Sequence, residues 1–442
     1  MPAIITNAFR TYNADNFIDS FASNKMYLMI GKADSWSGAS LGQYTETSPS
    51  DTAIPTQIDT TVATFIHHND MIAAKLISQS DVSHVVKRVD WTSGTVYTEY
   101  DHNQDDQIDQ TFFVMTDQFN VYKCISNYGG AASTVKPTGQ STSISETSDN
   151  YRWKFMYEVQ QADVLKYVTT DWIPVKYLSS DDGNLQWDVQ QAAVDGALEH
   201  IDVTAGGTGY VNTNTGTAQS GSTSTTIILA ATASATDDLY NNMTVYISSG
   251  TGSGQIKTIT DYVGSTKTAT VSTWTTTPGT DSVYEVMPLV TITTTEGSAA
   301  AARVSSVIGG VIKKVSMTAV GTLYRSATAV LTGGGGSGCT LEPRIGPKGG
   351  HGKNAKTELG GAYVMINIRL VGTEGGDFVV GDDFRKVILI ANPFAGGSVG
   401  TATTYTGAEL DDDSGEQIYI EYRAPINRAS DQTEDVKLVV EF

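Results

Sequence analysis

A strand–turn–strand unit that occurs twice constrains the fold of this chain more than any other feature. Residues 201–210 (IDVTAGGTGY) align with residues 315–324 (VSMTAVGTLY), and five of the ten positions are identical. Residues 290–298 (VTITTTEGS) then align with residues 329–337 (AVLTGGGGS). Four residues separate the aligned blocks in the second copy and 79 separate them in the first, so about 75 extra residues interrupt the first copy. The sequence therefore predicts a split β repeat over residues 201–211 and 287–344.

The interrupting segment also differs in composition from the rest of the chain. Residues 211–290 contain 20 Thr, two Lys and no Arg. Short runs of β-forming residues recur between Gly, Asn and Asp, at Thr225–Leu229, Met243–Ile247, Gln255–Thr260, Thr268–Val271 and Val283–Val286. Five such strands fit a small barrel or sandwich whose ends lie close together. We therefore predict an inserted Thr-rich small β domain over residues 212–286.

The flanking segments predict more strands and a few short helices. Helical spacing predicts a helix that Asn13 caps, a second helix over residues 70–78 and a third at Ala162–Tyr167. Alternating or apolar runs predict strands, at 26–30, within 84–125, and at 151–159, 363–369, 384–390, 417–422 and 436–442. The last strand is expected to pair within a sheet. The predicted class is mainly β, a multi-domain antiparallel sandwich or barrel architecture.

Charge and hydropathy argue against two classes of partner, nucleic acids and membranes. The 442 residues include 28 Lys+Arg and 48 Asp+Glu, a net charge of −20, and the largest basic clusters are pairs such as Lys313-Lys314. Such a chain repels phosphate backbones, so we expect no nucleic-acid partner. No run of 18 apolar residues exists and the first residues do not read as a signal peptide, so we expect no membrane partner either.

Two loops have the residue spacing of known ligand-binding loops, one for calcium and one for phosphate, but lack residues that such loops require. Residues 101–109 (DHNQDDQID) carry oxygen ligands at calcium-loop spacing, but Asp106 replaces the required Gly and Phe112 the bidentate Glu. Residues 333–340 (GGGGSGCT) have phosphate-loop spacing, but Cys339 stands where the Lys is needed. We interpret the first loop as a solvated acidic turn and the second as a turn between strands of the repeat.

The remaining candidate groups predict no catalytic, cofactor or metal site. The two cysteines, Cys124 and Cys339, are 215 residues apart and are interpreted as buried free thiols. None of the six histidines pairs with another at metal-ligand spacing; they are His67, His68, His84, His102, His200 and His351. No GxSxG or HExxH motif occurs, so we expect no enzyme.

Residues in both flanks resemble a known structural family. The densest match is the closing block, which reads Ser414-Gly415-Glu416-x-Ile418-Tyr419-x-Glu421-x-Arg423-x-Pro425-Ile426, followed by Asp431-Gln432-Thr433-Glu434 and the terminal Phe442. Shorter matches precede it in order, at Phe9-Arg10, Asn16-Phe17, Ser20, Gly31-Lys32, Trp36-Ser37, Arg88-x-Asp90-Trp91, Tyr122-x-Cys124, Tyr151-x-Trp153 and Tyr157-Glu158. Together they resemble the baseplate wedge proteins of contractile-tailed phages, the family of the gene-eight product of T-even phages.

The resemblance covers the flanks, predicted as the N-terminal (1–200) and C-terminal (345–442) parts of a wedge-protein core. It implies a homodimeric structural subunit of the virion's tail baseplate, which binds other wedge proteins, is assembled in the host cytoplasm and has no catalytic residues.

Two predictions about particular residues accompany this reading. Trp36, Trp91, Trp153 and Tyr422 are interpreted as core or interface anchors. Arg423 is expected at the end of a strand, making a fixed ion pair or backbone contact, with a solvated Arg as the open alternative. An alternative function is a carbohydrate- or receptor-binding tail protein, in which Trp274, Tyr246 and Tyr262 of the insert stack on host glycans.

Overall fold

Antiparallel strands dominate the computed structural model. It describes residues 6–33, 54, 71–104, 111–370, 383–406, 409–411, 414–430 and 435–442. The α-helices among these residues are α1 (Asn7–Ser23), α3 (Gln161–Tyr167), α4 (Leu185–Ala192) and α5 (Ala355–Glu358). The predicted mainly β architecture with a few helices is therefore confirmed. No helix in the described part of the chain is long and apolar enough to cross a membrane.

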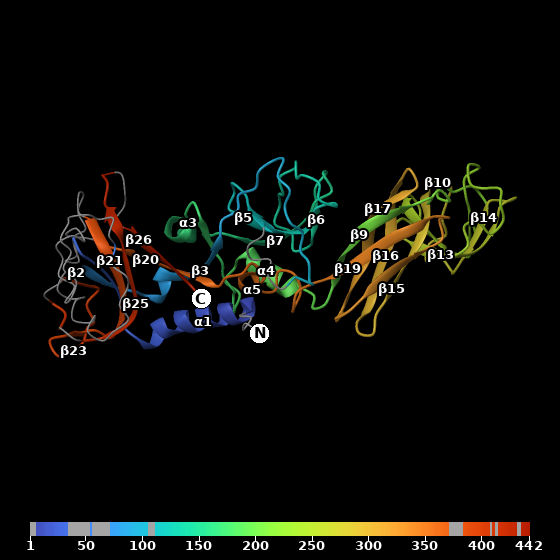
Figure 1. The fold of residues 1–442 in the computed structure, drawn as a ribbon. Coiled ribbons are helices and arrows are strands. Elements are labelled where there is room, and N and C mark those ends of the chain that lie inside the picture. The colour runs from blue at the N-terminus through green and yellow to red at the C-terminus, as the bar shows by residue number, and fades with distance from the viewer. Residues whose placement is uncertain are drawn as a thin grey trace, which may run out of the picture. The chain divides into compact units, whose positions relative to one another are not determined.

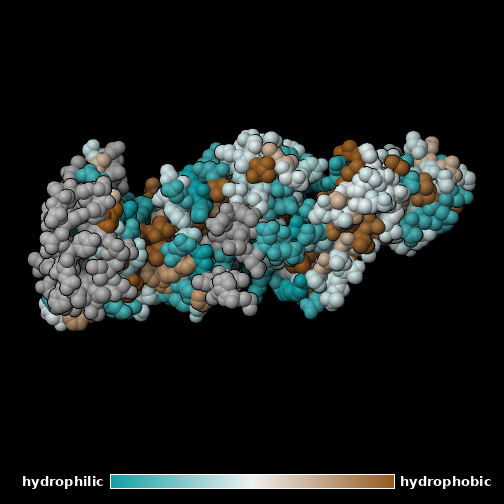
Figure 2. All heavy atoms as spheres, viewed as in Figure 1, coloured by the Kyte–Doolittle hydropathy of each residue, from teal (hydrophilic) through white to brown (hydrophobic). Residues whose placement is uncertain are grey.

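The chain folds into two compact units (Figure 1). The first unit comprises residues 1–88, 159–177 and 359–442, and the second comprises residues 89–158 and 178–358. Residues 1–200 therefore contribute to both units. Exposed apolar side chains such as Leu165, Val211 and Ile308 are scattered through the sequence. In Figure 2 the apolar residues of the face shown form separate patches between hydrophilic residues.

A five-stranded sheet of the first unit has β1 (Met26–Gly31) at its centre, fully buried. The strand order is β24 (Thr404–Tyr405), β2 (Met71–Leu76), β1, β21 (Asp383–Ala391) and β25 (Glu416–Asn427). The helix predicted over residues 70–78 is wrong, because residues 71–76 form β2. Met29 of β1 pairs with Ala74 and Ile30 pairs with Ala73. This pairing outweighs the helical spacing of the local sequence.

A four-stranded sheet of the same unit holds the C-terminal strand. Its order is β26 (Asp435–Glu441), β20 (Tyr363–Arg369), β3 (Val82–Lys87) and β8 (Trp172–Pro174). Val440 of β26 pairs with Val364 of β20, which confirms the predicted pairing of the last strand. Helix α1 begins at Asn7, where the Thr6 hydroxyl accepts a hydrogen bond from the Phe9 amide; the prediction that Asn13 caps it is wrong.

The second unit begins with a small sheet rich in aromatic residues. Its strand order is β4 (Phe113–Met115), β5 (Asn120–Ser126), β7 (Arg152–Glu158) and β6 (Ser145–Glu146). Tyr122, Cys124, Tyr151 and Trp153 are buried in one core, in which the Tyr151 and Trp153 rings stack with centroids 5.4 Å apart. This core confirms the interpretation of Trp153 as a core anchor.

The aligned residues of the repeat occupy equivalent positions in the second unit. The first copy contains β9 (Leu198–Thr208), the second half of β15 (Val283–Thr293) and β16 (Ser298–Ile308). The second copy contains β17 (Val311–Thr322), β18 (Thr328–Thr332) and β19 (Ser337–Ile345). The first strand of each copy pairs with the third strand of the other, β9 with β19 and β17 with β16. We call residues 198–208 and 289–345 the duplicated module.

Register and backbone geometry repeat between the two copies. Thr208 pairs with Ser337, and their aligned counterparts Thr322 and Ser298 pair in the same way. β-Bulges fall at aligned positions, between Thr340 and Leu341 in β19 and between Ala301 and Ala302 in β16. In the β15–β18 pair the aligned residues Thr291 and Val330 are partners of each other. The module therefore has an approximate twofold symmetry about this pair.

Two glycines at aligned positions make this arrangement possible. Gly207 has φ +59° and Gly321 has φ +62°, a backbone region that residues other than glycine rarely adopt. A Cβ atom on Gly207 would lie 2.4 Å from the Ser337 carbonyl oxygen, and one on Gly321 would lie 2.5 Å from the Ser298 carbonyl oxygen. Each glycine thus lets the first strand of its copy approach the third strand of the other.

The inserted segment builds a core of its own but shares a sheet with the module. It contains β10 (Asn214–Thr217), β11 (Thr226–Ile228), β12 (Met243–Ser249), β13 (Ile256–Val263) and β14 (Thr268–Val271). The five predicted runs correspond to β11–β15, while β10 (NTGT) lacks a strong β signal and was not predicted. The first half of β15 pairs with β10 and β12 and its second half with β18. The predicted boundary at 286/287 therefore falls inside one continuous strand.

Candidate functional site

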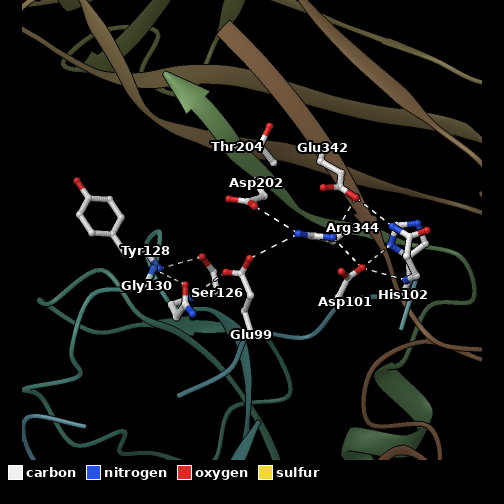
Figure 3. Close-up of polar contacts among 12 residues, drawn as sticks. Glu99, Asp101, His102, Ser126, Tyr128, Gly130, Asp202, Thr204, Glu342 and Arg344 are labelled. Atoms are coloured by element: carbon white, nitrogen blue, oxygen red, sulfur yellow. Dashed lines mark hydrogen bonds and ion pairs between the residues drawn. The ribbon is translucent and has the colours of Figure 1, made fainter. Parts of the chain in front are cut away.

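One arginine in the second unit is surrounded by four carboxylates, and we call these five residues the Arg344 cluster. The side chain of Arg344 is 9% exposed, and its Nη1 lies 2.7 Å from Asp101 Oδ1 and 3.1 Å from Glu342 Oε1. Its Nη2 donates a hydrogen bond to Asp202 Oδ2 at 3.3 Å and lies 3.7 Å from Glu99 Oε1. Figure 3 shows all four acidic side chains pointing toward the guanidinium group.

The register of β9 and β19 brings three of the five cluster residues together, with His200 beside them. Arg344 pairs with His200, and two residues along the ladder Glu342 pairs with Asp202. Because side chains two residues apart lie on the same face of a strand, all four project from one face. The other two carboxylates, Glu99 and Asp101, alternate in the same way along an extended segment.

Backbone hydrogen bonds hold that segment in place. The amide of Thr98 donates to the Thr111 carbonyl at 3.1 Å, and the amide of Tyr100 donates to the Cys124 carbonyl at 3.0 Å. Asp101 also accepts a hydrogen bond from the Asn103 amide at 2.9 Å, which closes a turn. The Asn103 side chain then donates to Glu342 at 3.0 Å and links the turn to β19.

The cluster contains more negative than positive charge. Its four carboxyl groups face one guanidinium, and the carboxyl side chains are 15% to 39% exposed. Burial, and then the neighbouring Asp202 carboxylate, raise the pKa of Glu99 to about 7. A proton on Glu99 is one way in which the fold lowers the repulsion between these groups.

A buried histidine borders the two carboxylates that Arg344 contacts least closely. His200 is 9% exposed; its Nδ1 lies 3.4 Å from Arg152 Nη1, and its Nε2 has no hydrogen-bond partner. Burial, followed by the charges of Arg152 and Arg344, lowers the pKa of His200 to about 3, so the imidazole is neutral near pH 7. One ligand atom each from Glu99, His200 and Asp202 lie within 4.8 Å of one another.

A pocket of about 380 Å³ opens beside this group. Its lining includes Arg152, His200, Asp202, Lys313 and Lys314, together with other residues of β9 and β17. Arg152 donates to the Glu199 carbonyl at 2.6 Å, and Lys314 pairs with Glu146. The arrangement can hold a proton or a cation between the carboxylates, next to a pocket large enough for several water molecules.

A second buried ion pair lies elsewhere in the same unit. Lys123 Nζ is 3.1 Å from Glu358 Oε2, and the two side chains are 1% and 4% exposed. Although burial alone raises the pKa of Glu358, the Lys123 ammonium and the neighbouring His351, 3.8 Å away, lower it to about 2. Glu358 also accepts hydrogen bonds from the amides of Gly352 and Asn354, at 2.9 Å and 3.1 Å. This pair is thus enclosed and satisfied.

The loops and thiols considered from the sequence have ordinary structural places. Asp101 belongs to the Arg344 cluster, while residues 105–110 of the acidic loop lie outside the described residues. Residues 333–336 connect β18 to β19, as expected for a turn between strands. Cys124 is a buried free thiol. Cys339, near the start of β19 where the neighbouring residues are exposed, is only half-buried, so the prediction that both are buried is wrong for Cys339.

The histidines predicted to have no shared site have different surroundings. His84 contacts the Gly361 carbonyl at 2.7 Å and Asp15 at 2.9 Å. His351 is buried beside the Tyr100 ring, with centroids 4.6 Å apart. His67 and His68 lie outside the described residues. Only His200, among the described histidines, joins two carboxylates in a group compact enough to hold an ion.

The aromatic residues and Arg423 also have definite positions. Tyr422 is buried and Trp91 packs against the core that contains Trp153, while Trp36 is not among the described residues. Arg423 lies inside β25, which continues to Asn427, so its predicted place at a strand end is wrong. Its side chain is 43% exposed and lies 3.4 Å from Glu421, two residues away on the same strand.

The three aromatic residues considered for glycan stacking do not present open faces. Trp274 and Tyr262 are 4% and 1% exposed, in the core of the insert. The guanidinium of Arg303 covers the Tyr246 ring at 3.9 Å from its centroid.

No protein-family model matches this chain, and no curated protein sequence matches it significantly.

Sequence reasoning missed the group formed by Glu99, His200 and Asp202. The available signal was the alternation of His200-x-Asp202 and Glu342-x-Arg344, which places charged side chains on one face of each strand. Only the pairing of β9 with β19 shows that these faces coincide.

Proposed function

We propose that this chain is a non-enzymatic structural subunit of a phage tail baseplate wedge, acting as a homodimeric scaffold that binds other wedge proteins. The observation that carries the proposal is the ordered resemblance of the flanks to that family. It is supported by where matched residues lie, since Tyr122, Cys124, Tyr151 and Trp153 pack into one buried core. Residues that maintain a core are what a structural family is expected to share.

Charge distribution supports a role in assembly. The insert carries five acidic and two basic residues in residues 211–290, so most of the chain's −20 charge lies outside it. Like charges keep free subunits apart, and a basic partner surface removes that repulsion on docking. The proposal therefore predicts partners with complementary basic surfaces.

The first test is the mass of the full chain in solution, alone and mixed with the other wedge proteins. Light scattering after size exclusion should give twice the chain mass alone and a larger discrete complex in the mixture. A monomer that joins no complex in any mixture would contradict the scaffold.

The second test asks what the insert contributes. Residues 212–286 are replaced with the short connection of the second copy, residues 325–328, because the two connections join aligned strands. If the insert binds a neighbouring wedge protein, the shortened chain should still form a dimer but should bind that partner with lower affinity. Unchanged affinity for every wedge protein would reduce the insert to a passive addition.

A further inference from the structure

We propose that Glu99, His200 and Asp202 bind a divalent transition-metal ion, with Zn²⁺ the best match. The inference is independent of the scaffold role. One ligand atom from each residue already lies within 4.8 Å of the other two. When a tetrahedral ion lies about 2.1 Å from each ligand atom, the ligand atoms are about 3.4 Å apart. Side-chain rotations that move these atoms by about an ångström would therefore complete the site.

The imidazole provides the observation that a group of acids alone lacks. His200 is nine-tenths buried, and its Nε2 has no hydrogen-bond partner. A buried nitrogen without a partner destabilises a fold, and coordination of a metal by this nitrogen would remove that penalty. A neutral imidazole with two carboxylates suits Zn²⁺, whereas Mg²⁺ and Ca²⁺ prefer oxygen ligands alone.

The charge of the surroundings also favours a cation. The Arg344 cluster has four carboxyl groups and one guanidinium. Arg344 Nη1 approaches Asp101 and Glu342 at 2.7 and 3.1 Å, while Asp202 and Glu99 lie farther from Nη2, at 3.3 and 3.7 Å. The proposed ligands are thus the two carboxylates that lie farthest from the arginine nitrogens, and of these Asp202 still accepts a hydrogen bond from Nη2.

Two further cations limit the affinity. Arg152 lies 3.4 Å from His200 Nδ1, and Lys314 lines the adjoining pocket, where it is paired with Glu146. Both repel an ion, so we expect a weaker affinity than three such ligands would give without these cations.

The ion would join two parts of the second unit. Glu99 lies in the segment before β4, whereas His200 and Asp202 lie on β9 of the duplicated module. The pocket beside His200 and Asp202 leaves room for a water as the remaining ligand.

The test is calorimetric titration of the tag-free, chelator-treated full chain with Zn²⁺. We expect one ion bound per chain at this site, a higher melting temperature with Zn²⁺, and no competition from Mg²⁺. His200→Gln and Asp202→Asn should each weaken binding at least about tenfold. Ser316→Ala is the matched control, because Ser316 is the counterpart of Asp202 in the other copy and pairs with Arg303 as Asp202 pairs with Glu342.

Three results would overturn the proposal. The first is a wild-type chain that binds no Zn²⁺, and the second is a His200→Gln variant that binds as many ions as tightly as wild type. The third is an equal loss in Ser316→Ala, which would indicate a general effect. If the variants fail to fold, Co²⁺ replaces Zn²⁺ in the wild-type chain, and proton NMR should show paramagnetically shifted signals from one imidazole; unshifted imidazole signals would overturn the site.

Discussion

The two halves of the duplicated module share a backbone plan but differ in their side chains at one place. β9 and β19 carry Asp202, Glu342, His200 and Arg344, whereas the aligned positions of β17 and β16 are Ser316, Arg303, Lys314 and Ser305. Where one pair of strands holds an arginine among carboxylates, the other holds two serines whose hydroxyls lie 2.8 Å apart. The shared backbone does not require this arginine among carboxylates, which we call the charged set. Its presence only on the β9–β19 pair of strands therefore indicates a specialised role.

The largest expected loss of stability comes from a substitution at Arg344, which can be compared with one at the aligned position of the other pair of strands. Arg344→Met leaves four carboxyl groups without their guanidinium, and we expect it to lower the free energy of unfolding by about 3–5 kcal/mol. Ser305→Ala at the aligned position removes one hydroxyl contact and should cost no more than about 1 kcal/mol. Urea unfolding of both variants at pH 7 measures the difference. Equal costs would mean that the charged set adds nothing to the shared plan.

A second pair of variants tests whether the backbone is equivalent. Gly207→Ala and Gly321→Ala each place a Cβ against a carbonyl oxygen at positive φ, and each should cost about 2–4 kcal/mol. The two values should agree within about 1 kcal/mol. Gly309 has φ +59° but no atom within 4 Å of an added Cβ, so Gly309→Ala should show the smaller cost of φ strain alone. A cost at only one of the two aligned positions would contradict the symmetry.

A third variant sharpens the comparison through pH. Burial and Asp202 raise the folded-state pKa of Glu99 to about 7, above its ordinary value of 4.5. The folded chain therefore binds this proton more tightly than the unfolded chain between these values. The resulting stability is fully present below pH 4.5 and is lost as pH rises through 7.

Glu99→Gln should remove that loss, which amounts to about 3 kcal/mol at most. Unfolding free energies of wild type and variant, measured from pH 5 to 8 with a chelator present, should converge at low pH and separate at high pH. The shift of His200 has the opposite sign, with stability lost as pH falls below 6.5, but it is common to both chains and cancels in the difference. Parallel curves would show that Glu99 does not retain its proton.

The smallest expected effect concerns the tyrosines that end each aligned block. Tyr324 Oη accepts a hydrogen bond from the Ala300 amide at 3.0 Å, and the amide of Cys339, the counterpart of Ala300, lies near the Tyr210 hydroxyl. Tyr324→Phe and Tyr210→Phe should each cost about 1 kcal/mol. Thermal unfolding of both variants provides the measurement. If one of the two substitutions leaves the free energy of unfolding unchanged, the two copies also differ at these tyrosines, and not only at the charged residues.

Sequence reasoning succeeded where the pattern is local. Alternation and β-branched residues predicted β1, β7, β20 and β21, and the alignment of residues 201–210 with 315–324 anticipated strands that turn out to be related by symmetry. It failed at residues 71–76, where spacing suggested a helix and pairing with β1 made a strand. Propensity is a weak guide when a neighbouring strand provides the hydrogen bonds.

The candidate site could not be predicted for a different reason. Glu99, His200 and Arg344 are separated by 101 and 144 residues in the sequence, and no motif spans such distances. Their meeting depends on the pairing of β9 with β19 across the insert and the whole second copy. The sequence could identify charged faces on individual strands but not the face that each one meets.

The continuity of β15 has a mechanical consequence. A force applied to the insert passes into the duplicated module along one covalent strand, and the hydrogen bonds between β15 and β18 resist it together, in shear rather than by peeling. Where the chain enters the insert, the Asn212 amide donates a hydrogen bond to the Gly334 carbonyl at 3.1 Å and anchors the outgoing connection. One continuous strand and this hydrogen bond thus join the insert to the sheet of the module, so a load on the insert would be carried by that sheet.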